Sequence, residues 1–349
     1  MSFELTELQE SARQVLSGET VSVPEDATWA QVAELGWLMV AVPEELGGLG
    51  MDAQGPVVLQ TELGRKLSGA PYLSAILAID AFCSSNHPER EAWLERLMAG
   101  EFVAAPLADG TLKVSQADSG IAVSGTATAV QSADKAAQLL VWDEQGRYIA
   151  LVDLEQNGVT VTARKSWDET RRLFDVAFES VPVDEALLLA QGDAAAALAR
   201  RLATLRDFGL AADAIGAADM LLEMTVEYLQ TRRQFGRPLA MFQALKHRCA
   251  DLKALVAGAD ALLQSHMAQC VDDLGSQQAE LKGEGVKLLA CDMFRRVAEE
   301  SLQLHGGIGM ADEHPCHLFL KRALLSEHLG RGLRHYENDL AAAFLNPAA

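Results

Sequence analysis

The feature that most constrains the fold is a helical repeat of apolar residues in the second half of the chain. Along one stretch they recur every three or four positions and keep to one face: Leu198, Leu202, Leu205, Ala212, Ile215, Leu222, Val226 and Leu229. That spacing predicts one long amphipathic helix. The sequence Gly236-Arg237-Pro238 is expected to end it, because proline cannot continue a helix and glycine tolerates the turn.

Three further helices are predicted after this one. The first follows a repeat that begins at Phe242 and runs to about residue 275. The next covers residues 277–304 and stops at His305-Gly306-Gly307, and the last starts near Pro315 and runs to about residue 345. Long helices with short connections predict an antiparallel four-helix bundle.

The region before the bundle has two different patterns. Residues 1–103 carry short apolar helical repeats that Gly and Pro interrupt. In residues 104–185 apolar residues alternate with period two, and turn pairs such as Asp109-Gly110 and Asn157-Gly158 separate the runs. Such alternation predicts a small antiparallel β-sandwich or barrel.

The chain is therefore expected to be a multi-domain protein, mainly α with a central small β domain. The predicted domains are an N-terminal helical domain at residues 1–103, a β domain at 104–185 and a C-terminal four-helix bundle at 186–349. Within the first domain, helices are expected at about 55–67, 72–83 and 87–98.

Composition excludes several classes of protein. Lys plus Arg is 29 and Asp plus Glu is 49, which gives a net charge of −20 and disfavours binding to nucleic acid. The five cysteines are scattered and form no CxxC pair, which indicates a reducing compartment rather than a disulfide framework. No signal peptide and no membrane span are recognisable, so a cytoplasmic protein is expected.

A basic cluster stands out against this acidic background. Arg232, Arg233 and Arg237 surround the predicted end of the long helix. Guanidinium groups beside free backbone donors can bind a phosphate or pyrophosphate. The alternative is a group of solvated arginines that favours the negative end of a helix.

A glycine-rich turn is the second notable segment. Gly306, Gly307 and Gly309 fall within four positions, so the backbone there can approach a ligand and offer N–H groups to a phosphate. The segment is not GxGxxG and follows no strand, so the alternative is a plain interhelical turn.

Several histidines crowd the same part of the chain. They are His305, His314, His317, His328 and His335. No HExxH motif and no obvious carboxylate complete a ligand set, so no metal site is predicted, and these residues are interpreted as helix-surface histidines.

Together these segments resemble the acyl-CoA dehydrogenase family. The run from Arg232-Arg-Gln-Phe-Gly-Arg-Pro-Leu to Phe242-Gln243 is similar to that family's C-terminal domain, and so is Gln303-Leu-His-Gly-Gly-Ile-Gly309. The start, Val42-Pro-Glu-Glu-Leu-Gly-Gly-Leu-Gly50, resembles its N-terminal domain. The likeness covers nearly the whole chain, in matching order.

The resemblance implies an α–β–α subunit that forms dimers, or dimers of dimers, with FAD across a subunit interface. It implies that these residues contact the adenosine-pyrophosphate half of a neighbour's FAD: Arg232, Gln234, Phe235, Phe242, Gln303, Gly306 and Gly307. The implied reaction is α,β-desaturation of an acyl-CoA thioester, in which a glutamate removes the α-proton and the flavin takes a hydride. An electron-transfer flavoprotein would accept the electrons.

The sequence departs from the family where the flavin ring would sit. The family's Thr-rich stretch is replaced by Ala104-Ala-Pro-Leu-Ala-Asp-Gly110. The family's flanking Trp and Thr positions align with Ala129 and Gln131. The flavin seat of this chain is therefore expected to be lost.

The family's catalytic glutamate is also missing. Counting the family's spacing from Gln303 leads to Gly330, and the alternative helix position is Arg206, with Asp207 beside it. Glu327 is the nearest carboxylate in the tail. Asp207 and Glu327 are therefore weak candidates for the base.

Three hypotheses follow. In the first, the chain is the short partner subunit of an α₂β₂ acyl-CoA dehydrogenase and supplies only the adenosine half of the FAD site. Such pairs often act on bulky acyl-CoAs, including steroid side chains in lipid catabolism. In the second, the chain is a self-sufficient homo-oligomer with a relocated carboxylate base. In the third, it is a non-catalytic scaffold or binding relative.

Overall fold

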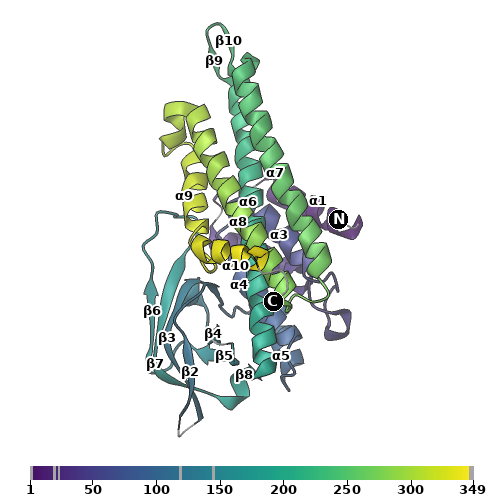
Figure 1. Cartoon of the computed structure of the whole chain (residues 1–349), viewed down its shortest axis with the longest axis vertical. Coiled ribbons are helices and arrows are strands. Elements are labelled where there is room, and N and C mark those ends of the chain that lie inside the picture. Colours follow the sequence, from purple (N-terminus) through teal and green to yellow (C-terminus); the bar gives the residue numbers. More distant parts are fainter. Residues whose placement is uncertain (1–2, 19–20, 23, 118–119, 144–145, 346–349) are drawn as a thin grey trace.

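The computed structural model describes residues 3–18, 21–22, 24–117, 120–143 and 146–345. A cluster of helices and a β module lie beside the lower part of a long helical bundle, and the upper part of the bundle projects beyond them (Figure 1). None of the described helices is long and apolar enough to cross a membrane. The predicted fold class, mainly α with a central small β domain, is confirmed.

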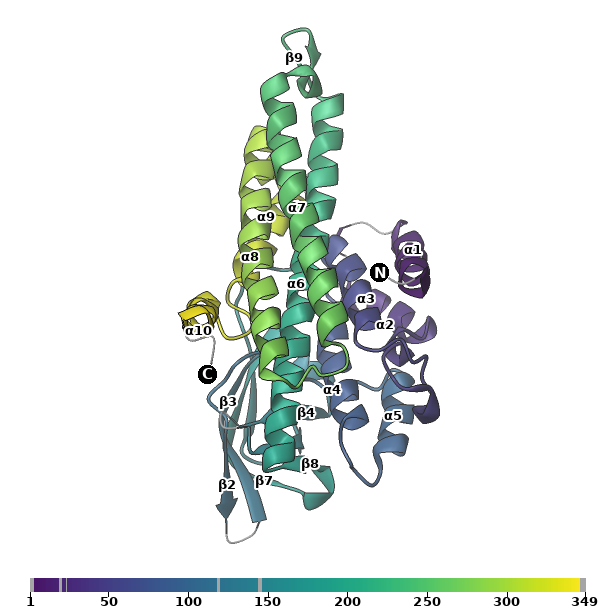
Figure 2. The same cartoon turned by 45° about the vertical axis from the view of Figure 1, so that its right-hand side comes forward.

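The N-terminal helices pack around one another and against the bundle (Figure 2). They are α1 (Phe3–Leu16), α2 (Glu25–Glu34), α3 (Gln54–Arg65), α4 (Tyr72–Cys83) and α5 (Arg90–Met98). Helix α3 is buried along nearly its whole length because it lies against α6 (Asp193–Thr231). A Cβ at Gly216 would overlap the carbonyl oxygen of Thr61, so glycine is what allows this close approach.

Two antiparallel sheets form the β module. One has the order β1-β3-β7-β6, with β2 also paired to β3, and the other has the order β4-β5-β8. Val123 and Val176 from the first sheet and Leu139 and Val152 from the second share one buried core. The strands are β1 (Pro106–Ala108), β2 (Lys113–Ala117), β3 (Gly120–Gln131), β4 (Gln138–Trp142), β5 (Tyr148–Asp153), β6 (Val159–Ala163), β7 (Leu173–Val183) and β8 (Leu188–Gln191).

The bundle consists of α6, α7 (Gln243–Cys270), α8 (Gln277–His305) and α9 (Cys316–Ser326). Helix α6 ends at Thr231, earlier than the predicted stop. Gly236-Arg237-Pro238 belongs instead to a short hairpin of β9 (Arg233–Gln234) and β10 (Arg237–Pro238) at the far end of the molecule (Figure 1). The boundaries at residues 103/104 and 185/186 stay a prediction.

The predicted last helix was wrong as a single element. The chain leaves α9 at Ser326, turns, and forms α10 (Leu333–Leu345), which lies across α8 (Figure 1). The physical reason is in the turn: Gly330 and Gly332 have φ of +76° and +81°, which no right-handed helix contains. The Gly330 N–H donates to the Leu107 carbonyl at 2.8 Å, and the Asp109 N–H donates to the Gly330 carbonyl at 3.0 Å.

A buried ionic network joins the β module to the bundle. Arg322 of α9 is fully buried, and its guanidinium donates to Asp168 Oδ2 at 2.7 Å and to Asp213 Oδ2 at 3.1 Å. Arg171 donates to Asp213 Oδ1 at 3.0 Å. Burial alone would raise the pKa of Asp168, but Arg322 and Thr170 hold it below its ordinary value. The network fixes the loop between β6 and β7 against α6 and α9.

Candidate functional site

The hairpin end of the bundle carries the basic cluster. Arg232, Arg233 and Arg237 are exposed, and none forms an ion pair with a carboxylate in the part of the chain that the structure describes. The Arg237 guanidinium carbon lies 4.1 Å from the centre of the Phe242 ring. Phe235 is 88% exposed, and its ring centre lies 6.1 Å from that of Phe242. Unpaired guanidinium groups beside open aromatic faces suit an anionic aromatic ligand.

The predicted residues of this cluster occupy defined positions. Arg232 follows the last residue of α6, and its N–H donates to the Tyr228 carbonyl at 2.8 Å. Gln234 and Phe235 form the hairpin, and Phe242 precedes the first turn of α7. The structure therefore brings these four residues together at one end of the molecule.

The glycine turn follows the last residue of α8. Gly306 has φ +65°, a conformation that L side chains rarely adopt. Gln303, Gly306 and Gly307 are all exposed, and a Cβ added at either glycine would meet nothing within 4 Å. The backbone of this turn is thus open to a ligand.

The two segments are in contact, although they are distant in sequence. Tyr228 of α6 stacks on His305, the last residue of α8, with ring centres 4.6 Å apart and an interplanar angle of 24°. His305 is only 3% exposed, so the interpretation of it as a helix-surface histidine was wrong. Sequence reasoning missed Tyr228 altogether, because helical periodicity does not show which aromatic residues face another helix.

The two positions that align with the family's flavin-flanking residues are enclosed by the chain's own contacts. Ala129 is fully buried. Gln131 is 1% exposed, and its amide donates to the carbonyls of Gly69 and Ala70 at 2.8 and 3.2 Å. The side chain of residue 131 therefore bonds to the N-terminal helical region and is not available to a flavin ring.

The position of the missing base is also filled. A Cβ at Gly330 would overlap the Tyr336 hydroxyl oxygen and lie 3.1 Å from Asp207 Oδ1. That hydroxyl donates to Asp207 Oδ1 at 2.8 Å and accepts the Arg331 N–H at 2.9 Å. Residue 330 consequently has no room for a side chain.

The two weak candidates for the base are both engaged in ion pairs. Asp207 is 2% exposed and lies 3.3 Å from Arg206 Nε. Burial raises the pKa of Asp207, while Arg206 and Tyr336 act in the opposite direction. Glu327 Oε1 lies 2.8 Å from Arg295 Nε. Their assignment as bases stays a prediction.

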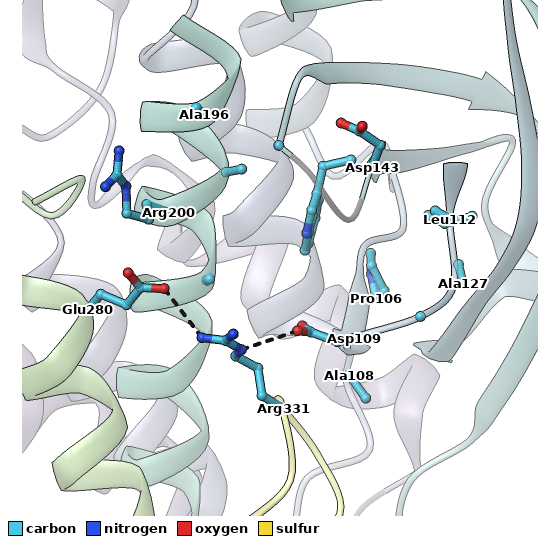
Figure 3. A pocket seen from close by; sticks show the side chains of 15 residues that line it. Pro106, Ala108, Asp109, Leu112, Ala127, Asp143, Ala196, Arg200, Glu280 and Arg331 are labelled. Carbon is cyan, nitrogen blue, oxygen red and sulfur yellow. Dashed lines mark ion pairs between the residues drawn. The ribbon is translucent and has the colours of Figure 1, made fainter. Parts of the chain in front are cut away.

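A pocket of about 400 Å³ lies between the β module and the start of α6 (Figure 3). Its walls include the Trp142 side chain on the β side and Arg200 on α6. Arg331 closes one end: its Nε lies 3.6 Å from Asp109 Oδ2 and its Nη1 lies 3.5 Å from Glu280 Oε1. The sequence did not reveal this pocket, because its lining comes from segments that are far apart along the chain.

Glu284 of α8 also belongs to the carboxylate group around Arg331. Its Oε1 lies 3.0 Å from Arg331 Nη1, and its Oε2 is buried with no partner among the described residues. Burial raises the pKa of Glu284 to about 7; Arg331 opposes this rise, and the neighbouring carboxylates Asp339, Asp207 and Glu280 add to it. The folded protein therefore holds a proton on Glu284 that the unfolded chain releases at lower pH.

This proton makes a pH dependence measurable. Because the folded-state pKa is the higher one, the free energy of unfolding should fall as pH rises from 4.5 to about 7. Glu284→Gln should remove about 3 kcal/mol of that fall. Urea unfolding at a series of pH values measures it. If the free energy of unfolding depended on pH in the same way in wild type and variant, Glu284 would not be the group with the raised pKa.

The comparisons with known proteins agree with this geometry. The model of the acyl-CoA dehydrogenase N-terminal domain matches residues 2–101, and that of the C-terminal domain matches residues 192–334. The acyl-CoA dehydrogenase IpdE2 of Mycobacterium tuberculosis is 33% identical over 302 residues, which cover 86% of this chain and 80% of that protein. This chain belongs to the acyl-CoA dehydrogenase family. It is thus a member of a family of FAD-dependent oxidoreductases that act on acyl-CoA.

Solved acyl-CoA dehydrogenase structures share the whole fold. In the ChsE4-ChsE5 complex from Mycobacterium tuberculosis, one chain superposes with a TM-score of 0.88 at 24% identity, covering 100% of this chain and 99% of that one. A glutaryl-CoA dehydrogenase from Mycobacterium smegmatis in complex with FADH2 gives 0.86 at 18% identity, covering 100% and 96%. Such neighbours share the fold of this chain from its N-terminal helices to its bundle.

The residues of this chain fit one part of FAD better than another. The hairpin end offers unpaired guanidinium groups and the open backbone of Gly306 and Gly307, which match a pyrophosphate. Ala129 and Gln131 are enclosed by the chain itself and offer no face to a flavin ring. The exposed residues at this end of the bundle therefore suit a pyrophosphate group, and Ala129 and Gln131 do not suit a flavin ring.

Proposed function

We propose that this chain is the short partner subunit of a two-component acyl-CoA dehydrogenase. Its hairpin end binds the adenosine-pyrophosphate half of an FAD whose flavin ring sits in a longer subunit. One contrast supports this: the cluster of Arg232, Phe235 and the glycine turn is open, whereas position 330 and the flavin seat are closed by Tyr336 and Gln131.

Each subunit then has its own task in the α,β-desaturation of an acyl-CoA thioester. Bound FAD supplies the group that accepts a hydride. The longer subunit contributes the base and the flavin seat, and an electron-transfer flavoprotein takes the electrons. In this chain Arg232 holds the pyrophosphate by charge-assisted hydrogen bonds, and the glycine turn, which carries no side chains at Gly306 and Gly307, lets the ligand approach its backbone.

Two further observations support this reading. One structural neighbour of the chain is described as a complex of two differently named proteins, ChsE4 and ChsE5, which is the kind of assembly proposed here. All five cysteines are free, as expected of a protein that works in the reducing cytoplasm.

Co-expression tests the proposal. The chain is produced alone, and again with a longer acyl-CoA dehydrogenase encoded in the same genome that retains the glutamate. Flavin absorbance and acyl-CoA-dependent dye reduction are then measured. We expect both signals only in the co-purified complex, with one FAD per pair of chains. Full FAD occupancy and turnover by the chain alone would support the self-sufficient enzyme instead, and their absence even with a partner would support the scaffold.

The arginine cluster gives a sharper prediction. Arg232→Ala should lower the FAD affinity of the complex by about tenfold or more, since a hydrogen bond to a charged group contributes about 1.5–3 kcal/mol. The fold should persist, because Arg232 is exposed. Equilibrium dialysis of flavin measures the affinity and thermal melting reports the fold. Arg334→Ala, at an exposed position on α10, is the control; equal FAD affinity in both variants would refute the assignment of Arg232.

A further inference from the structure

Three rings from three separate segments meet below the hairpin end of the bundle. Tyr228 comes from α6, His305 from the end of α8, and His314 from the turn before α9. The ring of His305 lies 4.6 Å from that of Tyr228 and 4.6 Å from that of His314, and Tyr228 meets His314 edge-on at 6.5 Å. We call Tyr228, His305 and His314 the aromatic cluster.

Two of the rings are directly attached to parts of the candidate site. The Tyr228 carbonyl accepts the Arg232 N–H at 2.8 Å, so the last turn of α6 joins the ring to the basic cluster. His305 is bonded through the main chain to Gly306, the residue with φ +65°. The stack between Tyr228 and His305 is therefore a side-chain link between two segments that are some 70 residues apart along the chain.

The neighbours of the histidines fix their rings. His305 Nδ1 lies 2.8 Å from the Ser301 carbonyl, to which it donates, and 3.7 Å from Cys316 Sγ. His305 Nε2 is buried with no hydrogen-bond partner among the described residues. The His305 ring is also in contact with the rings of Tyr228 and His314. Burial lowers the pKa of His305 and of His314, which leaves both imidazoles uncharged at neutral pH. Uncharged rings pack on a phenol without burying a charge.

We propose that Tyr228 is a positioning residue for the dinucleotide site: by stacking on His305 and meeting His314 edge-on, it fixes the glycine turn relative to Arg232. The ligand in this inference rests on the proposed function, whereas the link between the two segments does not. Stacked and edge-on aromatic pairs attract one another beyond the area that they bury, so the rings favour one relative position of the two segments.

Amide hydrogen exchange of the whole chain tests the link. Tyr228→Leu should speed exchange in residues 303–310 as well as in 229–238, although residue 228 lies on only one of these segments. Tyr228→Phe should restore the wild-type rates, because stacking needs the ring and not the hydroxyl. Gln230→Ala, an exposed neighbour on α6, is the matched control. Should Tyr228→Leu unfold the chain, His314→Ala removes the other side of the cluster and should have the same local effect.

Binding of ADP tests the consequence for the ligand. ADP is the adenosine-pyrophosphate portion of FAD, and its affinity for the chain can be measured by titration calorimetry. Tyr228→Leu should weaken ADP binding by about tenfold, and Tyr228→Phe should not. Unchanged exchange in residues 303–310 of Tyr228→Leu would overturn the inference. If the wild-type chain binds no ADP even in the flavin-free complex with the longer subunit, while exchange still responds, the proposed function fails and the link between the segments stands.

Discussion

Arg322→Met should lower the free energy of unfolding by about 3–5 kcal/mol, because removing one partner of a buried ionic network leaves the other charges uncompensated. Two carboxylates depend on this guanidinium: Asp168 at 2.7 Å and Asp213 at 3.1 Å. Arg171 remains beside Asp213, but Asp168 loses its hydrogen-bonded cation. Methionine fills much of the volume, so the loss reports charge rather than a cavity.

Chemical denaturation with a matched surface variant measures this effect. Arg96 pairs with Glu101 at the surface and is half exposed, so Arg96→Met should cost at most about 1 kcal/mol. If the free energy of unfolding fell by a similar amount in both variants, the buried Arg322 network would stabilise the fold no more than an exposed ion pair does. Because the pKa of Asp168 lies below its ordinary value of 3.8 in the folded protein, its contribution to stability in the wild type should be lost progressively as pH falls below 3.8.

Restoring the missing glutamate is the second change with a large expected effect. Gly330→Glu should destabilise the chain by about 3 kcal/mol or more, since a left-handed backbone costs a side chain about 1–2 kcal/mol and steric overlap adds to that. The overlap is with the Tyr336 hydroxyl, which is held by Asp207. We also expect no dehydrogenase activity from this variant alone, because the flavin seat stays filled by Gln131.

Gly332→Glu separates the two causes. Gly332 has φ +81°, but a Cβ there would meet nothing within 4 Å, so only the backbone cost applies. Thermal melting of both variants should show the larger drop for Gly330→Glu. Equal drops in melting temperature would mean that Tyr336 moves aside at no cost. Acyl-CoA-dependent turnover by Gly330→Glu would show that position 330 can again hold a catalytic glutamate.

Local patterns predicted those elements that local chemistry decides. The helix expected at 72–83 is present as Tyr72–Cys83, because proline precedes it and an apolar run fills it. The break between α9 and α10 escaped prediction. Gly330 and Gly332 alone do not show that the chain will turn there, since the turn is stabilised by β1, a strand some 220 residues earlier in the sequence.

In the candidate site, too, the residues in contiguous motifs were predicted and those that depend on long-range contacts were not. Arg232 and Gly306 were recognisable because their motifs are contiguous and resemble a family. Tyr228 and the pocket bounded by Arg331 and Trp142 were not, since each depends on which faces of distant elements meet. Packing between elements, rather than propensity within them, decides those contacts.

The bridge between Gly330 and β1 also constrains the order in which the chain folds. During synthesis the N-terminal part leaves the ribosome first, but the backbone groups of Leu107 and Asp109 find their partner only when Gly330 has emerged. Contacts across such a long separation slow folding, because the loop must close before the bonds form. We therefore expect this edge of the β module to form its native hydrogen bonds late in folding, after the strands that pair with neighbours close in sequence.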